Sequence, residues 1–295
     1  MTKPKPPTFS EFGKRFPTEE ACLEHLMRTR WGQKHPCVKC GREAKYYRVK
    51  GRRSYECEFC GHQVYPTAGT PFENTRTPLK SWFLVMFMFC TSRNGVSAKE
   101  VQRTLGVTYK TAWRMCNLIR QYMGYVDGDG PVGGPDGDRG AVEIDEAFLG
   151  GYDPRPGPGD KKAVLGMVER GGEVVAVYAP DRRSAAVMKT IRWNVAPCST
   201  IYTDEAGVFG GIGFTDMRYT HSTINHAKKE WVRGDTHTNT IESFWANLKR
   251  GINGTYIHVS SQHLQKYLWE FEYRHNMRHS PHLMLDTLLL AFPRP

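Results

Sequence analysis

Four cysteines constrain the fold of this chain more than any other feature of its sequence. They form two C-x-x-C pairs separated by sixteen residues: Cys37, Cys40, Cys57 and Cys60. Each pair can sit on a tight turn, and a hairpin between the pairs can bring the four sulfurs together in the tetrahedral arrangement that zinc prefers. Because four thiolates leave no open position for a substrate, the pattern predicts a structural Zn²⁺ in a zinc ribbon over residues 31–76.

The hairpin between the two cysteine pairs is rich in basic and aromatic residues, among them Arg52, Arg53 and Tyr55. Such side chains suit phosphates and bases, so Arg52 and Arg53 are candidate DNA contacts, although a solvated basic surface is the alternative. The whole chain has 41 Lys and Arg against 30 Asp and Glu and a formal net charge of +11. This balance favours a polyanionic partner, and nucleic acid is the first candidate.

Residues 77–122 have the pattern of a helical DNA-binding region. Two amphipathic helices are separated by a turn at Gly106, and Thr108 can cap the second helix. In a DNA-reading helix-turn-helix the second helix enters the major groove with the start of the helix toward the bases. The candidate DNA contacts at that position are Tyr109, Lys110 and Arg114. A helical hairpin inside a core is the alternative.

Composition divides the chain further. Residues 123–140 are rich in Gly and predict a linker, and residues 1–30 predict an amino-terminal helical segment. Residues 141–280 then form a second folded domain, and residues 281–295 a carboxy-terminal tail. The start of the chain lacks the apolar core of a signal peptide, and no apolar run is long enough to cross a membrane. We therefore expect a cytoplasmic protein without a membrane partner.

The stretch Ala141–Gly151 alternates apolar and acidic residues with period two. It predicts a strand with Val142 and Ile144 on one face and Glu143 and Asp145 on the other. Asp145 would stand on a stiff backbone, which suits a metal ligand, whereas a solvated strand end is the alternative.

A second acid follows a predicted crossover. The expected elements are strands at 161–170 and 173–179, a helix at 184–195 and a buried strand at 200–204 that ends in Asp204. A helical crossover allows the last strand to lie parallel to the Asp145 strand and beside it. The two carboxylates would then be neighbours.

A third acid lies on a predicted amphipathic helix within residues 236–251. Thr238 or Asn239 can cap this helix. Asn239, Glu242 and Lys249 fall roughly on one flank, since Glu242 follows Asn239 by one turn and precedes Lys249 by two. This flank can supply a metal ligand and a phosphate contact, although a glutamate that pairs with a surface neighbour is the alternative.

These motifs together resemble a known family. The acidic strand 142–151, the strand that ends in Asp204, the helix 237–251 and the segment 270–278 resemble, in this order, the bacterial insertion-sequence transposases of the DDE type. The most similar branch carries an amino-terminal zinc ribbon ahead of a helix-turn-helix (ISXO-like). The resemblance implies an α/β fold with a ribonuclease-H-like catalytic domain at residues 141–280.

The resemblance also implies roles for single residues. Asp145 and Asp204 match the two aspartates of the family, Glu242 the third acid, and Lys249 the basic residue seven positions later. Because members of this branch can present asparagine as the third group, Asn239 stays an alternative ligand. Acids of this kind hold two Mg²⁺ ions, or Mn²⁺, about 4 Å apart, which suits phosphodiester cleavage.

The sequence therefore predicts a DNA transposase. It would bind the terminal inverted repeats of an insertion sequence, cleave strands and transfer them to target double-stranded DNA, acting as a homo-oligomer associated with the bacterial nucleoid. A DNA-binding regulator with an inactive nuclease fold is the alternative from another class. A structure-specific nuclease that cannot join ends is a third.

Overall fold

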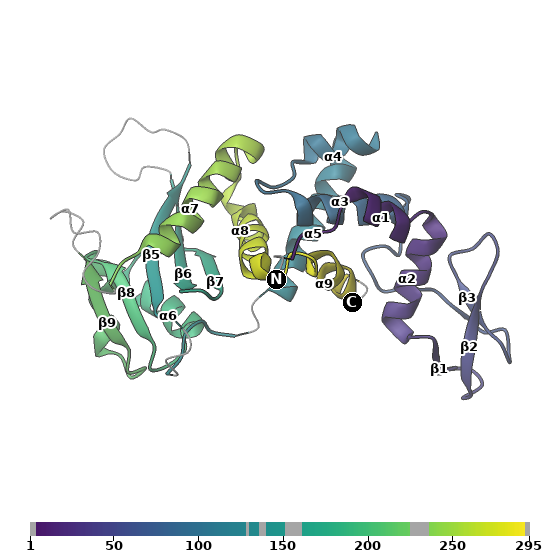
Figure 1. Ribbon diagram of the computed structural model, residues 1–295, viewed down its shortest axis with the longest axis horizontal. Coiled ribbons are helices and arrows are strands. Elements are labelled where there is room, and N and C mark those ends of the chain that lie inside the picture. Colours follow the sequence, from purple (N-terminus) through teal and green to yellow (C-terminus); the bar gives the residue numbers. More distant parts are fainter. Residues whose placement is uncertain (1–3, 128–129, 136–139, 151–160, 225–235, 293–295) are drawn as a thin grey trace. The chain divides into compact units, whose positions relative to one another are not determined.

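The computed structural model describes residues 4–127, 130–135, 140–150, 161–224 and 236–292. The chain divides into two compact units, coloured along the sequence in Figure 1. Unit 1 comprises Met1–Ser92, Ala98–Tyr122 and Ser280–Pro295, and unit 2 comprises Arg93–Ser97 and Met123–His279. No helix in the described ranges combines the length and the apolar character that crossing a bilayer requires.

Unit 1 is a set of helices with a small antiparallel sheet. Its elements are α1 (Phe9–Arg15), α2 (Glu19–Trp31), β1 (Lys34–Pro36), β2 (Glu43–Arg48), β3 (Tyr55–Cys57), β4 (Gln63–Val64), α3 (Leu79–Thr91), α4 (Ala98–Leu105), most of α5 (Tyr109–Val126) and α9 (Met284–Ala291). Aromatic rings fill the helical core, where Phe292 packs on Phe72, Trp82 and Tyr122. The segment predicted as a tail thus contains a helix whose apolar side belongs to this core.

The small sheet has the strand order β1-β2-β3-β4 and is antiparallel throughout. Its buried cluster consists of Cys37, Ala44 and Cys57, with Cys40, Tyr46 and Cys60 packed against it. So little apolar surface cannot hold a hairpin pair by itself, because small modules of this size depend on disulfides or metals.

Unit 2 is built on a five-stranded mixed sheet with the order β7-β6-β5-β8-β9. Its elements are β5 (Val142–Leu149), β6 (Lys162–Glu169), β7 (Val174–Tyr178), α6 (Ser184–Asn194), β8 (Thr200–Asp204), η1 (Gly207–Phe209), η2 (Ile212–Phe214), β9 (Thr220–Ile224), α7 (Asn239–Gly251), η4 (Ile252–Tyr256), α8 (Ser261–Asn276) and η5 (Met277–His279). β5, β6 and β7 form an antiparallel meander, and β8 runs parallel to β5. The predicted position of the Asp204 strand beside the Asp145 strand is therefore confirmed.

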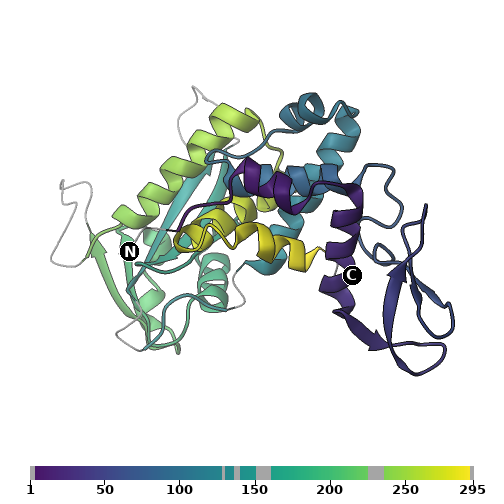
Figure 2. The same cartoon turned by 45° about the vertical axis from the view of Figure 1, so that its right-hand side comes forward.

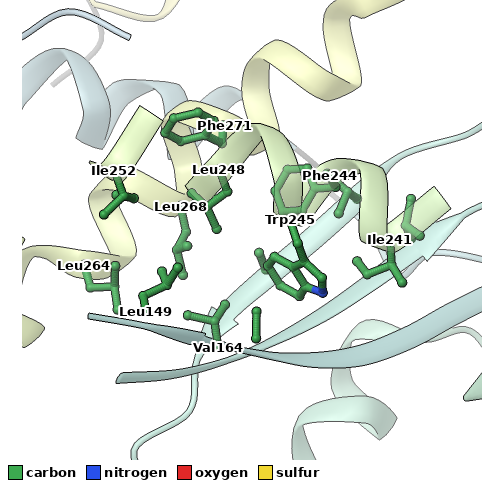
Figure 3. Close-up of a cluster of buried hydrophobic side chains, with 14 of the residues drawn as sticks. Leu149, Val164, Ile241, Phe244, Trp245, Leu248, Ile252, Leu264, Leu268 and Phe271 are labelled. Atoms are coloured by element: carbon green, nitrogen blue, oxygen red, sulfur yellow. The ribbon is translucent and has the colours of Figure 1, made fainter. Parts of the chain in front are cut away.

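Two separate clusters cover the two faces of this sheet. Val142 and Ile144 pack on the α6 side. Ala147 and Leu149 belong to the cluster that side chains of α7 and α8 form on the other face (Figure 3). The ribbon views show these helices beside the sheet (Figures 1 and 2). The period-two alternation predicted for β5 is thus realised, and its acidic face is the one that α7 covers.

Side chains of α8 close the free edge of β7. Asn276 Oδ1 accepts from the Val174 N–H at 2.8 Å, and Gln265 Oε1 accepts from the Tyr178 N–H at 2.9 Å. Between them a carboxylate oxygen of Glu272 accepts from the Ala176 N–H. Alternate residues of an edge strand expose their backbone groups in this way, and α8 satisfies them with residues of one helix face.

Candidate active site and zinc ribbon

Asp145 and Asp204 lie on neighbouring strands at the same level. Glu143 of β5 pairs with Tyr202 of β8 in the parallel register, and two residues further the same register sets Asp145 level with Asp204. The pairing of the two strands stops before this level, and β8 ends at Asp204. Because side chains alternate along a strand, both aspartates project to the α7 face, where the strands begin to separate.

Glu242 of α7 joins the two aspartates electrostatically. Burial raises the pKa of Asp145 to about 6, and the negative charges of Asp204 and Glu242 act in the same direction. The N–H groups of Glu146 and Trp245 stabilise the carboxylate and oppose the rise. Three acids that are far apart in the sequence therefore share one electrostatic environment.

The donor set suits hard divalent cations. Carboxylate oxygens are the ligands that Mg²⁺ and Mn²⁺ prefer, and a cation would offset both the burial and the repulsion that raise the pKa of Asp145. In the described part of the chain, only the four cysteines of the ribbon have all their ligand atoms within 4.8 Å of one another. Asp145, Asp204 and Glu242 do not form a group that close.

The other two predicted residues lie on α7. Asn239 is the first residue of the helix and is exposed, whereas Glu242 accepts a hydrogen bond from Thr238 Oγ1 at 3.1 Å. Thr238 occupies the cap position, but its side chain makes no bond to the helix backbone. Lys249 is exposed in the last turn.

Two functional contacts at this site were not predicted. Trp245 donates from Nε1 to Asp145 Oδ2 at 3.0 Å. Its ring lies directly over Gly166, where an added Cβ would come within 2.5 Å of Trp245 Cζ2. The second is Glu143, which is fully buried and accepts from the N–H groups of Thr240 and Ile241. A tryptophan N–H in a core and a carboxylate on a covered strand face both require partners, and this requirement is the signal that could have revealed them.

The four cysteines meet as predicted. Their Sγ atoms are 3.6 Å apart for Cys37 and Cys60 and 3.9 Å apart for Cys40 and Cys57. A tetrahedron with Zn–S bonds of about 2.3 Å has edges of about 3.8 Å. The backbone N–H of Cys40 lowers the pKa of the Cys37 thiol to about 5, which favours the thiolate that a metal needs. The residues present therefore fit a structural Zn²⁺.

Within the region predicted at residues 77–122, which also contains α3, the two helices around Gly106 are α4 and α5, joined by a short turn. Gly106 in this turn has a φ of +66°, and Thr108 Oγ1 accepts from the Thr111 N–H at 3.2 Å as the cap of α5. Three side chains near the start of α5 are exposed: Tyr109, Lys110 and Arg114. Their exposure leaves them accessible to a ligand.

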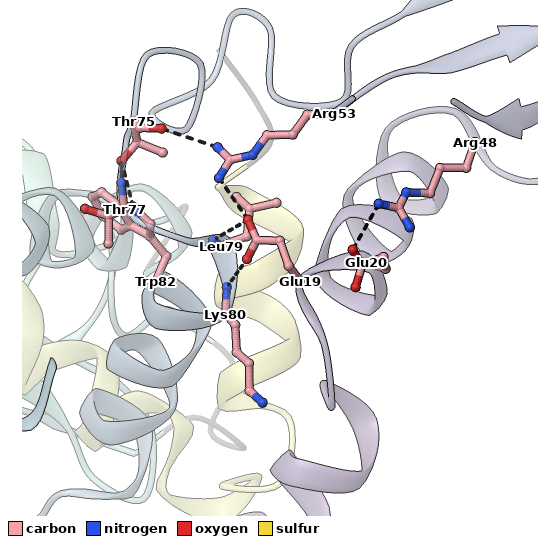
Figure 4. A network of polar contacts seen from close by, with 9 residues as sticks. All are labelled: Glu19, Glu20, Arg48, Arg53, Thr75, Thr77, Leu79, Lys80 and Trp82. Carbon is pink, nitrogen blue, oxygen red and sulfur yellow. Dashed lines mark hydrogen bonds and ion pairs between the residues drawn. The ribbon is translucent and has the colours of Figure 1, made fainter. Parts of the chain in front are cut away.

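The two candidate arginines of the ribbon differ in their surroundings. Arg52 is exposed. Arg53 donates from Nη2 to Glu19 Oε1 at 2.9 Å and from Nη1 to the Thr75 carbonyl at 3.3 Å (Figure 4). The Arg53 guanidinium is therefore engaged within unit 1, and Arg52 is the freer contact for a phosphate.

Comparison with known proteins gives two matched segments. Residues 139–276 match the ISXO2-like transposase domain, and residues 17–63 match the transposase zinc-ribbon domain. An uncharacterized protein in transposable element ISH50 of Halobacterium salinarum is 26% identical over 290 residues, which cover 91% of this chain and 94% of that protein. An uncharacterized transposase-like protein of Haemophilus influenzae is 30% identical over 107 residues, which cover 35% of this chain and 81% of that protein.

The matched transposase domain contains the β5, β8 and α7 acids, and the matched ribbon contains all four cysteines. Both segments occur in the order expected from the sequence. The chain belongs to the ISXO2-like insertion-sequence transposases of the DDE type that carry an amino-terminal zinc ribbon.

Proposed function

We propose that this transposase binds the terminal inverted repeats of its insertion sequence, cleaves DNA strands there and joins them to target DNA. The observation that carries the proposal is the strand register that sets Asp145 of β5 level with Asp204 of β8, on the sheet face that α7 with Glu242 covers. Acids gathered around a buried carboxylate are costly to the fold unless they serve a cation or a reaction.

Asp145, Asp204 and Glu242 would hold the divalent ions, with Glu242 preferred over Asn239 because its charge acts on Asp145. The bound ions supply positive charge that stabilises the attacking and leaving oxygens of an in-line displacement at phosphorus. Trp245 fixes the orientation of the Asp145 carboxylate through its N–H. Lys249 has the position and charge to bind a phosphate of the DNA strand.

The chemistry needs no further co-substrate. Attack of water on a phosphodiester breaks the bond between phosphorus and the 3′ oxygen and leaves a 3′-hydroxyl and a 5′-phosphate. Attack of that 3′-hydroxyl on a phosphodiester of the target forms one phosphorus–oxygen bond and breaks another, so the number of ester bonds is conserved. In both steps the acids and Lys249 act by placing charge and orienting the phosphate.

Recognition of DNA is assigned to unit 1. The exposed side chains of Tyr109, Lys110 and Arg114 on α5 would contact the terminal repeat, and Arg52 of the ribbon a nearby phosphate. The formal charge of +11 supports a polyanionic partner. Since both ends of the element must be held together, the active species is an oligomer on DNA.

The test measures magnesium-dependent nicking of DNA that carries the terminal repeats. Asp145→Ala and Asp204→Ala are expected to abolish nicking and retain DNA binding. Glu205→Ala is the matched control, because Glu205 is an exposed acid directly after Asp204, and it should nick like the wild type. A wild-type protein that binds the repeats but never cleaves them would instead establish a regulator. Strand transfer from a precut end separates a transposase from a nuclease that cannot join.

A further inference from the structure

The start of α7 lacks a cap from its own segment. The Thr238 hydroxyl donates to Glu242, four residues along the chain, and its oxygen accepts from no N–H group of the helix. The N–H groups of Thr240 and Ile241, which a cap residue normally satisfies, point to Glu143 Oε2 at 2.8 and 3.0 Å. A carboxylate on β5 therefore caps a helix that begins almost one hundred residues later.

Glu143 has no capacity left for a metal. Besides the two backbone donors at Oε2, its Oε1 accepts from Arg170 Nε at 2.7 Å and from Thr240 Oγ1 at 3.0 Å. Arg170 also donates from Nη2 to the His237 carbonyl at 2.9 Å, which fixes the segment just before α7. Each carboxylate oxygen thus has two donors, which fills its lone pairs, and His237 Nδ1 also lies 3.1 Å from Oε1. Glu143 faces the same side of the sheet as Asp145 but works as an internal acceptor.

Two contacts attach α7 to β5 at matching intervals. Glu143 holds Thr240 and Ile241, and two residues further Asp145 holds Trp245. Two residues of a strand span about 6.6 Å, and the four to five residues between the helix contacts span about 6.8 Å. The helix therefore cannot slide along the strand without breaking one of the two contacts. Glu242 lies between these attachment points, so its position relative to Asp145 is set by both.

From these contacts we infer that Glu143 is a positioning residue for the third acid. Glu143 fixes the first turn of α7 on β5, and the Thr238 hydroxyl at the start of that turn donates to Glu242. Together these contacts set where the Glu242 carboxylate lies relative to Asp145, whose pKa its charge helps to raise. The inference rests on the proposed function in that it takes these three acids as the ligands of divalent ions. It adds a residue that touches neither the ions nor DNA. The affinity of the three acids for the ions nevertheless depends on this residue.

The test compares Glu143→Gln with the wild-type full-length protein by two readouts. Mn²⁺ affinity, measured by calorimetry, should fall at least 10-fold, which is the usual effect of losing a partner that orients a metal ligand. Hydrogen exchange of the Thr240 and Ile241 amides should accelerate at least 10-fold, because a glutamine side chain presents only one acceptor oxygen to the donors around it.

The matched control is Glu19→Gln. Glu19 caps α3 of unit 1 through the N–H groups of Leu79 and Lys80 and pairs with Arg53, so the substitution removes the same chemistry elsewhere. It should leave the Mn²⁺ affinity unchanged. A double variant Glu143→Gln with Glu242→Gln should bind Mn²⁺ no more weakly than Glu242→Gln alone, since Glu143 is inferred to act through Glu242.

The outcomes separate the inference from the proposed function. If Glu143→Gln binds Mn²⁺ as the wild type does, or weakens binding further in the Glu242→Gln background, the positioning role is overturned and the proposed function stands. If the wild type binds Mn²⁺ no better than Asp145→Ala, the proposed function fails, and with it the positioning role.

If Glu143→Gln does not fold, Glu143→Asp replaces it, because aspartate keeps the charge beside Arg170 but is one methylene shorter. An unchanged Mn²⁺ affinity in Glu143→Asp would then overturn the inference, and a reduced affinity would support it.

Discussion

Helices α3 and α7 begin in the same way in two different units. The cap position of α3 is Pro78, which has no side-chain bond to the helix, and the first turn is held by Glu19 of α2. Figure 4 shows the Glu19 carboxylate accepting from the N–H groups of Leu79 and Lys80 while Arg53 donates to it. Glu143 and Arg170 repeat this arrangement at α7.

The two glutamates differ in burial. The side chain of Glu19 is 32% exposed, whereas that of Glu143 is 0% exposed. Water can replace part of what Glu19 provides, because an exposed helix start is solvated. At α7 the Glu143 carboxylate itself is out of reach of solvent, so its loss leaves the N–H groups of the helix and the Arg170 guanidinium without their acceptor. The same glutamate–arginine cap therefore contributes modestly to the stability of unit 1, whereas the fold of unit 2 depends on it.

Removing the carboxylate that caps each helix should give the largest difference in stability between the two units. Glu143→Ala is expected to destabilise unit 2 by about 3–5 kcal/mol, the usual cost of leaving one member of a buried ion pair alone. Glu19→Ala should cost unit 1 about 1 kcal/mol, as for an exposed helix cap. Urea unfolding followed by peptide-resolved hydrogen exchange reads the two units separately. Equal losses would show that burial does not distinguish the two caps.

Much of the acid site was predictable because its signals are local. The period-two pattern assigned Glu143 and Asp145 to one face of β5, and the crossover rule set the Asp204 strand beside it. The ribbon was equally accessible, since the spacing of four cysteines leaves few other arrangements. In each case neighbouring residues, or a general rule of chain connection, carry the information.

The capping of α7 was not predictable in this way. Thr238 stands where a helix cap is expected, but the N–H groups of Thr240 and Ile241 donate to Glu143 instead of to its hydroxyl, which itself donates to Glu242. That outcome depends on how α7 lies along β5, which no local pattern encodes. The helix within residues 281–295 was not predicted, for another reason. Its apolar side is specified by the aromatic core of unit 1, far away in the sequence.

Glu272 is a third carboxylate to set beside Glu19 and Glu143, and it is buried. No arginine is among the groups that shift its pKa. Glu272 accepts from the Ala176 N–H, and burial and the charge of Asp127 raise its pKa well above the usual range. Burial also raises the pKa of Asp127 to about 7, although Asn276 donates to it at 2.8 Å. The folded state therefore binds these protons more tightly than the unfolded chain, so this contribution to stability is complete below about pH 4 and is lost as the pH rises toward 7.

The expected effect is a loss of about 1.4 kcal/mol for each pH unit that Asp127 spends between its unfolded and folded pKa values. Hydrogen exchange of β6 peptides between pH 5.5 and 7, corrected for the intrinsic rate of exchange, measures it. Asp127→Asn cannot titrate and should have a flatter dependence. An identical slope in this variant would assign the pH dependence to other groups.

Each of the two helices also carries a buried tryptophan that donates a hydrogen bond, so the comparison extends beyond the helix caps. Trp82 of α3 donates from Nε1 to Thr75 Oγ1 at 3.2 Å, and Trp245 of α7 donates to the Asp145 carboxylate at 3.0 Å. Both rings are buried, so Trp→Phe removes similar apolar area. A bond to a charged acceptor contributes about 1.5–3 kcal/mol and a neutral one about 0.5–1.5 kcal/mol. Trp245→Phe should therefore cost about 1 kcal/mol more than Trp82→Phe in urea unfolding, and a reversed order would contradict the assignment.

The smallest expected difference comes from the arginines. Arg170 uses two sides of its guanidinium, one for Glu143 and one for the His237 carbonyl, and it also lies over the Tyr202 ring at 4.6 Å. A lysine at this position can keep the ion pair but neither the second bond nor the planar stacking, so Arg170→Lys should destabilise unit 2 by about 1 kcal/mol. Arg53→Lys should cost unit 1 no more than about 0.5 kcal/mol, because that pair is more exposed. The urea midpoints of both variants measure these losses of stability. If Arg53→Lys lowers the midpoint more than Arg170→Lys does, the two hydrogen bonds of Arg170 do not hold the start of α7.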